Sequence, residues 1–239
     1  MGRLRFNITM TLDGYVAGPN QSVKNPLGEG ADHLHDWMLK LKTFREPHGD
    51  VGGETGINDD VLRENFANAG ATIMGRNMFG GGPGPWGKEP WRGWWGDDPP
   101  FHHPVFVLTH HAREPLVMQG GTTFTFVTDG IESALEQAKE AAGTKVVVLG
   151  GGADVAQQYL AAGLIDEMEI HVVPLLFGGG ARLFDDLRGS DVKIEPIRTI
   201  EGPGVTHLKY RIVAQRPRSA ERAGDRVDEL SAVSEAVSG

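Results

Sequence analysis

Residues 146–154 read Val-Val-Val-Leu-Gly-Gly-Gly-Ala-Asp, a short apolar run, three glycines and the start of a helical pattern. A run rich in β-branched residues predicts a buried strand, which the glycines end. Glycine lets the backbone approach a phosphate closely, and the first N–H groups of a helix point at it. The stretch does not match Gly-x-Gly-x-x-Gly, because position 155 is Val, and no Gly-Lys-Ser/Thr follows. It predicts an anion site or, as the alternative, a tight turn.

Strands and helices alternate along most of the remaining chain. Alternation with period two over 3–12 predicts a strand, and short apolar runs predict others at 71–74, 104–108, 124–127 and 168–176. Apolar residues at helical spacing predict helices over 31–44, 59–68, 131–142 and 153–162. Residues 192–200 and 205–213 flank a Gly-Pro-Gly turn and predict a terminal hairpin. We expect an α/β fold in three layers: a mostly parallel sheet, helices on both of its faces and a C-terminal antiparallel hairpin.

Composition limits the class of protein. The chain has 239 residues, no cysteine and a formal net charge of −9. The missing cysteines exclude a disulfide framework, a thiolate metal site and a cysteine nucleophile. The acidic balance argues against nucleic acid and anionic membranes as partners. With no apolar run long enough for a membrane span or a signal peptide, we expect a cytoplasmic protein.

The composition changes at Arg216, where aromatic residues cease and charges become frequent. We expect one domain over 1–215. The charged tail over 216–239 is expected to be disordered or weakly helical.

Two further polar groups follow predicted strands. Arg76 comes directly after the 71–74 run and can meet a phosphate with its guanidinium, or form a surface salt bridge instead. Thr109, His110 and His111 follow the 104–108 run and can contact phosphate or ribose. Both groups, like the 150–152 glycines, lie at the carboxyl ends of strands, where open α/β sheets bind ligands.

The segment 80–100 is too rich in Gly and Pro for a regular element, and it holds four of the five tryptophans. Long loops of this kind are often lids, binding loops or partner contacts. The alternative is a loop that its tryptophans fold onto its own domain.

The order of motifs along the chain resembles a known family. The motifs are Thr-Leu-Asp-Gly-Tyr-Val-Ala-Gly from 11, Ile-Met-Gly-Arg-Asn-Met-Phe from 73, Val-Phe-Val-Leu-Thr-His from 105 and Val-Leu-Gly-Gly-Gly from 148. They resemble the dihydrofolate reductase superfamily. The stretch 162–184 is closest to the reductase (C-terminal) domain of bacterial riboflavin biosynthesis proteins. The resemblance covers 3–213 and implies a dihydrofolate-reductase-like fold.

The resemblance also implies a function: an NADPH-dependent reductase that transfers a hydride to a small heterocyclic (pteridine- or pyrimidine-like), carbonyl or imine substrate, as a homodimer. In such an enzyme the cofactor carries the chemistry, and the protein aligns the reactants and excludes water. By motif, the implied cofactor-binding residues are Val16 and Ala17 near the nicotinamide; Gly75, Arg76 and Asn77 at the phosphates; Thr109 and His110 at the adenosine end; and Gly150, Gly151, Gly152, Ala153 and Asp154 at the pyrophosphate and nicotinamide.

Met78 departs from the Gly-Arg-x-Thr pattern of dihydrofolate reductases, so one phosphate-binding hydroxyl is missing. This departure leaves open a second function, a non-catalytic nucleotide-binding or assembly protein on the same fold.

A proton must also reach the product, and the candidate catalytic residues are Asp13 and Asp36. Asp13 precedes a glycine, where an aspartate also stabilises turns. Asp36 and Asp32 both lie near the place of the pterin-binding acid, and spacing does not decide between them. His171, in an apolar strand, is a third candidate that also suits a structural role. Neighbouring histidines point in divergent directions, and His-Glu-x-x-His does not occur, so we expect no metal.

Overall fold

The computed structural model describes residues 2–88, 91–185, 187 and 192–213. The tail expected over 216–239 lies outside the described residues. Of the expected 1–215 domain, the structure describes these ranges as far as Val213. Within them, no helix has the length and apolar character that crossing a bilayer requires.

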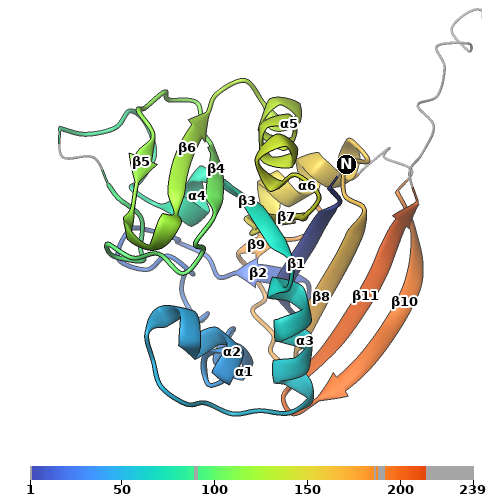
Figure 1. Cartoon of the computed structure of the whole chain (residues 1–239). Coiled ribbons are helices and arrows are strands. Elements are labelled where there is room, and N and C mark those ends of the chain that lie inside the picture. The colour runs from blue at the N-terminus through green and yellow to red at the C-terminus, as the bar shows by residue number, and fades with distance from the viewer. Residues whose placement is uncertain (1, 89–90, 186, 188–191, 214–239) are drawn as a thin grey trace, which may run out of the picture.

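Nine strands of the described residues form one mixed sheet (Figure 1). In spatial order they are β10 (Lys193–Gly202), β11 (Val205–Val213), β8 (Glu167–Val173), β1 (Leu4–Thr11), β7 (Val146–Leu149), β3 (Ala69–Gly75), β4 (Pro104–Leu108), β6 (Thr123–Val127) and β5 (Leu116–Val117). The strands from β8 to β6 are parallel, whereas β5, β11 and β10 pair antiparallel with their neighbours. The expected mostly parallel sheet and C-terminal hairpin are confirmed.

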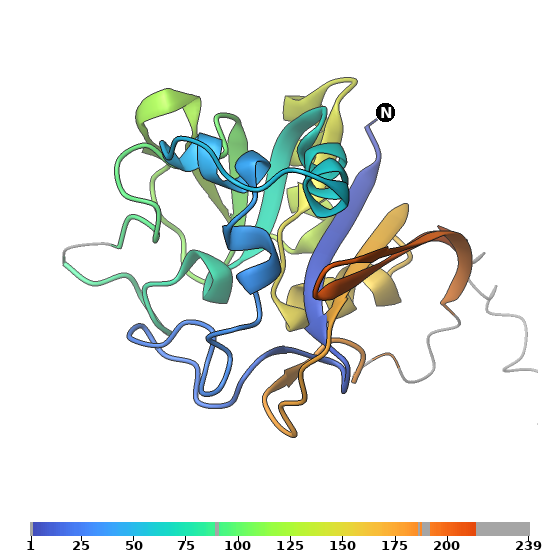
Figure 2. The same ribbon diagram turned by 90° about the horizontal axis from the view of Figure 1, so that it is seen from below.

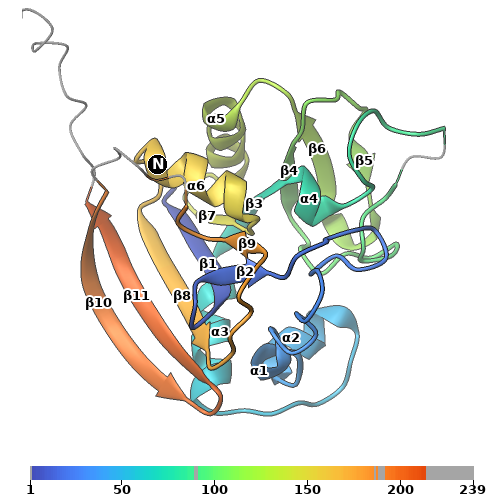
Figure 3. The same ribbon diagram turned by 180° about the vertical axis from the view of Figure 1, so that it is seen from behind.

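Helices cover both faces, as expected. On one face, α5 (Ile131–Ala142) and α6 (Ala153–Ala161) pack on β3, β4 and β7 (Figures 1 and 3). The buried side of α5, which faces the sheet, carries Ala134, Ala138 and Ala142. Their small side chains allow the helix to lie close to the strands. The central core between these layers contains Phe6, Ile73 and other fully buried residues.

The opposite face carries α1 (Asp36–Leu39), α2 (Lys42–Arg45) and α3 (Ile57–Phe66), seen from below in Figure 2. A single helix over 31–44 was expected. The structure breaks it at Leu41, which is extended (φ −74°, ψ 143°) and forms a parallel bridge with Glu54. The apolar side chains at helical spacing are still buried, because Leu34, Trp37 and Leu41 pack together in a cluster with Leu62.

The remaining elements are short. They are β2 (Tyr15–Ala17), β9 (Ala181–Arg182), α4 (Arg76–Phe79) and the 3₁₀ turns Glu46–His48 and Gln119–Gly121. β2 and β9 pair with each other in a second, two-stranded sheet.

The tryptophans of the 80–100 segment bind their own domain. The indole N–H groups of Trp86, Trp91 and Trp94 donate to the carbonyl oxygens of His111, Phe79 and Met78 over 2.9, 2.8 and 2.9 Å. Trp86, Trp91 and Trp95 also pack against the apolar cluster around Phe79 and Phe124. The described part of the loop therefore fits the alternative in which tryptophans fold it onto the domain.

Candidate active site

Three polar bends leave the sheet side by side. β7, β3 and β4 are parallel neighbours, so the segments 150–152, 75–77 and 109–110 follow them at one edge. The N–H of Gly75 donates to the carbonyl oxygen of Gly151 over 3.2 Å, and the N–H of Gly150 donates to that of Ile73 over 2.8 Å. The structure thus brings together ten of the twelve predicted cofactor residues, those of these bends and the adjoining Ala153 and Asp154.

The glycine bend borders open space. Gly151 and Gly152 have φ values of 123° and 31°, in the region that favours glycine. A Cβ at Gly152 would meet no atom within 4 Å. Gly152 is also the N-cap of α6 and brings no side-chain cap, so the first N–H groups of the helix are free for an anion. The exposed Asp154 in the first turn competes for the same positive helix end.

Arg76 and Arg113 meet at Trp86. The guanidinium of Arg76 donates to the carbonyl oxygens of Gly80 and Gly82, each over 3.0 Å, and its Cζ lies 3.2 Å from the centroid of the Trp86 ring. The Cζ of Arg113 lies 4.8 Å from that centroid. Among the described residues neither guanidinium has an ion-pair partner, and Nη1 of Arg76 is buried without a hydrogen bond. Burial, followed by the charge of Arg113, lowers the pKa of Arg76. This arrangement fits a phosphate group.

Met78 packs against the glycine bend. A Cβ at Gly150 would lie 3.3 Å from its Sδ and Cε, and one at Gly151 would lie 3.9 Å from its Sδ. A thioether therefore fills apolar space where the related pattern has a hydroxyl.

The other predicted cofactor residues differ in exposure. Val16 and Ala17 are 9% and 5% exposed, lie in β2 against β9, and are not among the cavity-lining residues described below. Asn77 and His110 are exposed beside the bends, whereas Thr109 is buried and its hydroxyl accepts from the N–H of His111 over 3.2 Å. Cofactor binding by all these residues stays a prediction.

The carboxylate of Asp13 is surrounded by donors. It accepts from the Thr11 hydroxyl over 2.6 Å and from the N–H groups of Phe177 and Gly178 over 3.0 and 2.8 Å. The Thr11 hydroxyl, followed by these N–H groups, lowers the pKa of Asp13. The geometry suits a carboxylate that fastens the β1 turn to the 177–178 segment and gives no support to proton donation. Its catalytic role stays a prediction.

Asp36 lies at the start of α1, with a side chain that is 59% exposed and 2.8 Å from Nδ1 of His33. It faces a small cleft of about 250 Å³ between α1 and Pro203. It does not line the cavity of about 800 Å³ that is described in the next paragraph. Its catalytic role also stays a prediction, and the geometry does not favour it.

A cavity of about 800 Å³ opens on the α1–α3 face of the sheet and extends to Gly150 and Met78 at the glycine bend. Its floor comes from β1, β3 and β7, and its walls come from the α1–α3 layer and the 95–104 segment. Aromatic and apolar side chains dominate the lining: Trp37, Met38, Phe44, Phe66, Met78, Trp95 and Phe101. The polar lining consists of Asn7, Thr9, Asn65, Thr72, five histidines and Lys145.

We call this space the neutral cavity, because its described lining contains no Asp, Glu or Arg. Burial lowers the pKa of three of the lining imidazoles: that of His35, that of His103 to about 4 and that of His171 to about 3. Lys145 is an exposed residue at the amino end of β7, distant from the glycine bend.

A chain of hydrogen bonds fixes His171 in the cavity wall. Its Nδ1 lies 2.7 Å from Nδ1 of His207, whose Nε2 lies 3.1 Å from Oδ1 of Asn58. Nε2 of His171 lies 3.3 Å from Nδ2 of Asn65. Because the Asn58 oxygen only accepts, His207 donates from Nε2 and accepts at Nδ1, so His171 donates from Nδ1 and accepts from Asn65. Both imidazoles are neutral in this arrangement.

The orientation leaves the oxygen of Asn65 without a donor. Asn65 is 1% exposed, and its Oδ1 has no hydrogen-bond partner among the described residues; the same is true of Oδ1 of Asn7. The ring of Trp37 packs on His171 and His207 at centroid distances of 4.8 and 5.2 Å, and its N–H donates to the Thr9 hydroxyl over 3.2 Å. His171 is thus a structural residue, the alternative expected from its apolar strand, and also a wall of the cavity.

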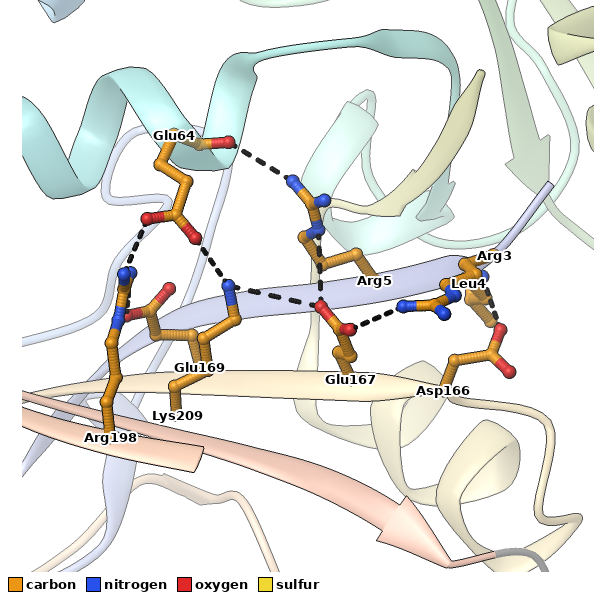
Figure 4. Close-up of polar contacts among 9 residues, drawn as sticks. All are labelled: Arg3, Leu4, Arg5, Glu64, Asp166, Glu167, Glu169, Arg198 and Lys209. Atoms are coloured by element: carbon orange, nitrogen blue, oxygen red, sulfur yellow. Dashed lines mark hydrogen bonds and ion pairs between the residues drawn. The ribbon is translucent and has the colours of Figure 1, made fainter. Parts of the chain in front are cut away.

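Beside the cavity, α3 meets β8, β11 and β10 through ion pairs (Figure 4). Glu64 accepts from Lys209 and from Arg198, each over 2.6 Å, and Arg198 reaches the fully buried Glu169 at 3.2 Å. Lys209 also lies 3.9 Å from Glu167. We call these five residues the charged seam. Burial raises the pKa of Glu169, against the lowering effect of Arg198 and Lys209.

Sequence reasoning missed Arg113, Trp86, His207, Asn58 and Asn65 as parts of the site. Each is unremarkable in its own segment, and only the fold brings it to its partners. Of these residues, only Arg113 could have been found from the sequence, because it is a cation that follows the predicted Thr109 by four residues. Within the described residues, no three His, Asp or Glu side chains are grouped as metal ligands.

Comparisons with known proteins agree with this fold. The family model of the RibD C-terminal domain matches residues 3–206. A curated relative, the uncharacterized protein YyaP of Bacillus subtilis (strain 168), is 23% identical over 214 residues, which cover 87% of this chain and 94% of YyaP.

Solved structures are also similar. One is from Shewanella sp. PV-4 and is provisionally named a riboflavin biosynthesis protein (24% identity, TM-score 0.57, 89% of this chain and 99% of that one). Another is RibD of Acinetobacter baumannii, with 17% identity and a TM-score of 0.53. The match covers 89% of this chain and 58% of that RibD chain. Together with the family match, these likenesses confirm the expected mostly parallel α/β fold of a riboflavin-biosynthesis reductase domain.

Proposed function

Because the chain belongs to the RibD C-terminal domain family, we propose that it is an NADPH-dependent reductase of a small heterocyclic, carbonyl or imine substrate. The observation that carries the proposal is the junction of three strand-end bends with an open cavity at Gly150. The bends suit the phosphates of a dinucleotide, and the cavity suits a flat acceptor.

The described residues fit two of the anionic groups of the cofactor. The unneutralised guanidinium groups of Arg76 and Arg113 would hold its 2′-phosphate, and the open glycine bend before α6 would hold its pyrophosphate. When bound, NADPH supplies the hydride and leaves as NADP⁺. The protein would align the acceptor over β1 and β7 and exclude water around it. Because the described cavity lining has no carboxylate, we assign the accompanying proton to water.

Binding experiments test this proposal. Tryptophan fluorescence should fall saturably as NADPH is added, since Trp86 lies against Arg76. Arg76→Ala should weaken NADPH binding about tenfold or more and leave NADH binding nearly unchanged, because a hydrogen bond to a charged group contributes about 1.5–3 kcal/mol. Arg211→Ala, an exposed arginine on β11, is the matched control and should change neither affinity.

A second function has one observation in its favour. The Arg76 guanidinium is already engaged by the Gly80 and Gly82 carbonyl oxygens and by Trp86, and Met78 supplies no hydroxyl. A non-catalytic nucleotide-binding or assembly protein on this fold would have the same features. An absence of NADPH binding at 1 mM cofactor would favour that function over the reductase.

We further propose a homodimer, as the family resemblance implies. Apolar side chains remain available on the β10–β11 hairpin, where Ile194 and Ile197 are 48% and 42% exposed. Light scattering after size exclusion should then give about twice the chain mass of 25.8 kDa. A mass equal to one chain at micromolar concentration would contradict the dimer.

A further inference from the structure

We propose that Trp86 positions the guanidinium groups of Arg76 and Arg113 for the 2′-phosphate of NADPH and so determines the preference for NADPH over NADH. This inference rests on the proposed function, because it names a specificity-determining residue of the same site. Trp86 acts through the two arginines and is therefore a positioning residue. Three features carry the inference: the cations that meet at the indole ring, the contacts that fix the ring, and the hydrogen bonds that orient the two arginines.

One indole ring serves both arginines. The Cζ of Arg76 lies 3.2 Å from the centroid of the Trp86 ring, and the Cζ of Arg113 lies 4.8 Å from it. The electron-rich face of an indole attracts a guanidinium group and leaves its charge in place. Burial comes first and the charge of Arg113 second among the causes that lower the pKa of Arg76, so the two cations are close enough to repel each other. An anion beside both of them relieves this repulsion.

The fold fixes the position of the ring. The indole N–H of Trp86 donates to the carbonyl oxygen of His111 over 2.9 Å. The rings of Phe79 and Phe126 meet it in T-shaped contacts, at centroid distances of 6.0 and 5.1 Å. His111 belongs to the segment that follows β4, at the sheet edge where the three bends lie. The protein itself therefore holds the ring in place beside the proposed cofactor site.

Hydrogen bonds to neutral acceptors orient the two guanidinium groups. Nε and Nη2 of Arg76 donate to the carbonyl oxygens of Gly80 and Gly82, each over 3.0 Å. Nη1 of Arg113 donates to the carbonyl oxygen of Trp91, whereas its Nε and Nη2 are not buried and have no partner within the part of the chain that the structure describes. Because the acceptors are carbonyl oxygens, both positive charges remain. A phosphate can thus accept hydrogen bonds from Arg113, while Arg76 adds positive charge.

The 2′-phosphate is the group that distinguishes NADPH from NADH. A guanidinium group that can turn away from this phosphate loses hydrogen bonds and must be ordered when the phosphate binds. The Trp86 ring restricts both guanidinium groups, so it should favour 2′-phosphorylated ligands. A purely structural tryptophan would affect ligands with and without this phosphate alike.

Calorimetry tests the inference with two probes, adenosine 2′,5′-bisphosphate and adenosine 5′-monophosphate, which differ only in the 2′-phosphate. The wild type should prefer the bisphosphate at least about tenfold, because its extra hydrogen bonds join charged groups. Trp86→Leu should reduce this preference to about threefold or less, because leucine has no ring face for either arginine. The affinity of this variant for the monophosphate should stay unchanged.

Two further variants locate the effect in the ring. Trp86→Phe keeps an aromatic face but lacks the N–H that reaches His111, and it should retain a preference of at least about fivefold. Trp94→Leu is the matched control in the same loop. The indole N–H of Trp94 also donates to a carbonyl oxygen, that of Met78 over 2.9 Å, but its ring pairs with that of Trp91. Trp94→Leu should therefore keep the full preference.

A spectroscopic measurement decides the matter if Trp86→Leu does not keep the circular dichroism spectrum of the wild type. The bisphosphate should change the tryptophan emission of the wild type more than the monophosphate does, since its 2′-phosphate would lie near the two cations at the indole. Trp86→Phe should remove this difference while it still binds the bisphosphate. Equal emission changes in the wild type would contradict the inference.

The outcomes separate this inference from the proposed function. The role of Trp86 is overturned by a wild type without preference, by an unchanged preference in Trp86→Leu, by equal weakening of both probes, or by an equal loss of preference in Trp94→Leu. In each of these cases NADPH binding leaves the reductase proposal standing. Absence of NADPH binding by the wild type overturns the reductase proposal, whereas the ratio between the two probes still tests Trp86.

Discussion

Two neighbouring regions on one face of the sheet bury polar groups in opposite ways. The charged seam pairs Glu64, Glu167 and Glu169 with Arg198 and Lys209 beneath α3. The neutral cavity lies next to it, lined from α3 by Leu62, Asn65 and Phe66, and its described lining contains no carboxylate or guanidinium group. Carboxylate and guanidinium groups thus gather where the fold supplies partners, whereas the described cavity lining has one ammonium group, that of Lys145 at the amino end of β7.

Both regions leave some buried polar atoms without a partner among the described residues, and in the seam these are Oε2 of Glu169 and Nε of Arg198. Glu64 uses both carboxylate oxygens on cations, and the seam therefore contributes to the fixed position of α3. The cavity wall leaves the amide oxygens of Asn7 and Asn65 without donors. The two regions therefore differ in charge and not in how completely their buried polar atoms are paired.

The largest expected effect is on pH dependence. Burial lowers the pKa of His171 to about 3 and that of His207 to about 4, below the unfolded value of 6.5. Their neutral forms therefore contribute stability above pH 6.5, and this is lost as pH falls toward 4, because the unfolded chain binds the protons first. When the unfolded chain binds one more proton at each of the two histidines, the free energy of unfolding falls by about 3 kcal/mol per unit decrease in pH.

Urea unfolding between pH 7 and 4.5 measures this slope, and the His171→Asn/His207→Asn double variant removes both rings. The wild type should lose stability more steeply than the double variant over that range. Parallel pH curves would contradict the neutral imidazole chain.

A smaller effect is expected when the seam loses one partner. Arg198→Met leaves the fully buried Glu169 without its only described ion-pair partner, so the free energy of unfolding should fall by about 3 kcal/mol. The matched control is Arg211→Met on β11, whose pair with Glu195 is more than half exposed and should contribute less than about 0.5 kcal/mol. Urea denaturation at pH 7.5 compares them, and equal losses would mean that the seam is not a buried network.

The smallest of these effects comes from moving charge into the cavity. Asn65→Asp places a carboxylate in the neutral wall with nearly unchanged shape, and should cost about 2 kcal/mol of stability at pH 8. Gln158→Glu makes the same chemical change on the exposed side of α6 and should be nearly neutral. If thermal unfolding shows no difference between the two variants, the contrast between seam and cavity is not electrostatic.

The sequence predicts the fold well where periodicity and burial agree. The strand at 104–108 and the helix at 131–142 coincide with β4 and α5. The first was predicted from a continuous apolar run and the second from apolar residues at helical spacing. The helix expected over 31–44 is divided, because the long-range bridge between Leu41 and Glu54 overrides local spacing. The two-residue strands β5 and β9 carry too little pattern to be predicted.

Some parts of the candidate site could likewise be predicted from the sequence, and others could not. The glycine, Arg76 and Thr109 bends could be predicted, since each follows an apolar strand directly. The cavity could not, because Asn65, His171 and His207 come from α3, β8 and β11 and acquire their roles only through mutual contacts. Asp36, like Asp32, lies near the expected place of an acid in the related family, yet it sits at the exposed start of α1 and is absent from the cavity lining.

A crystal structure of the protein soaked with NADPH tests the central claim most directly. The account predicts the 2′-phosphate between Arg76 and Arg113, the pyrophosphate on the 150–152 bend and the nicotinamide at the mouth of the neutral cavity. A cofactor bound elsewhere, or bound with its nicotinamide turned away from that cavity, would contradict it.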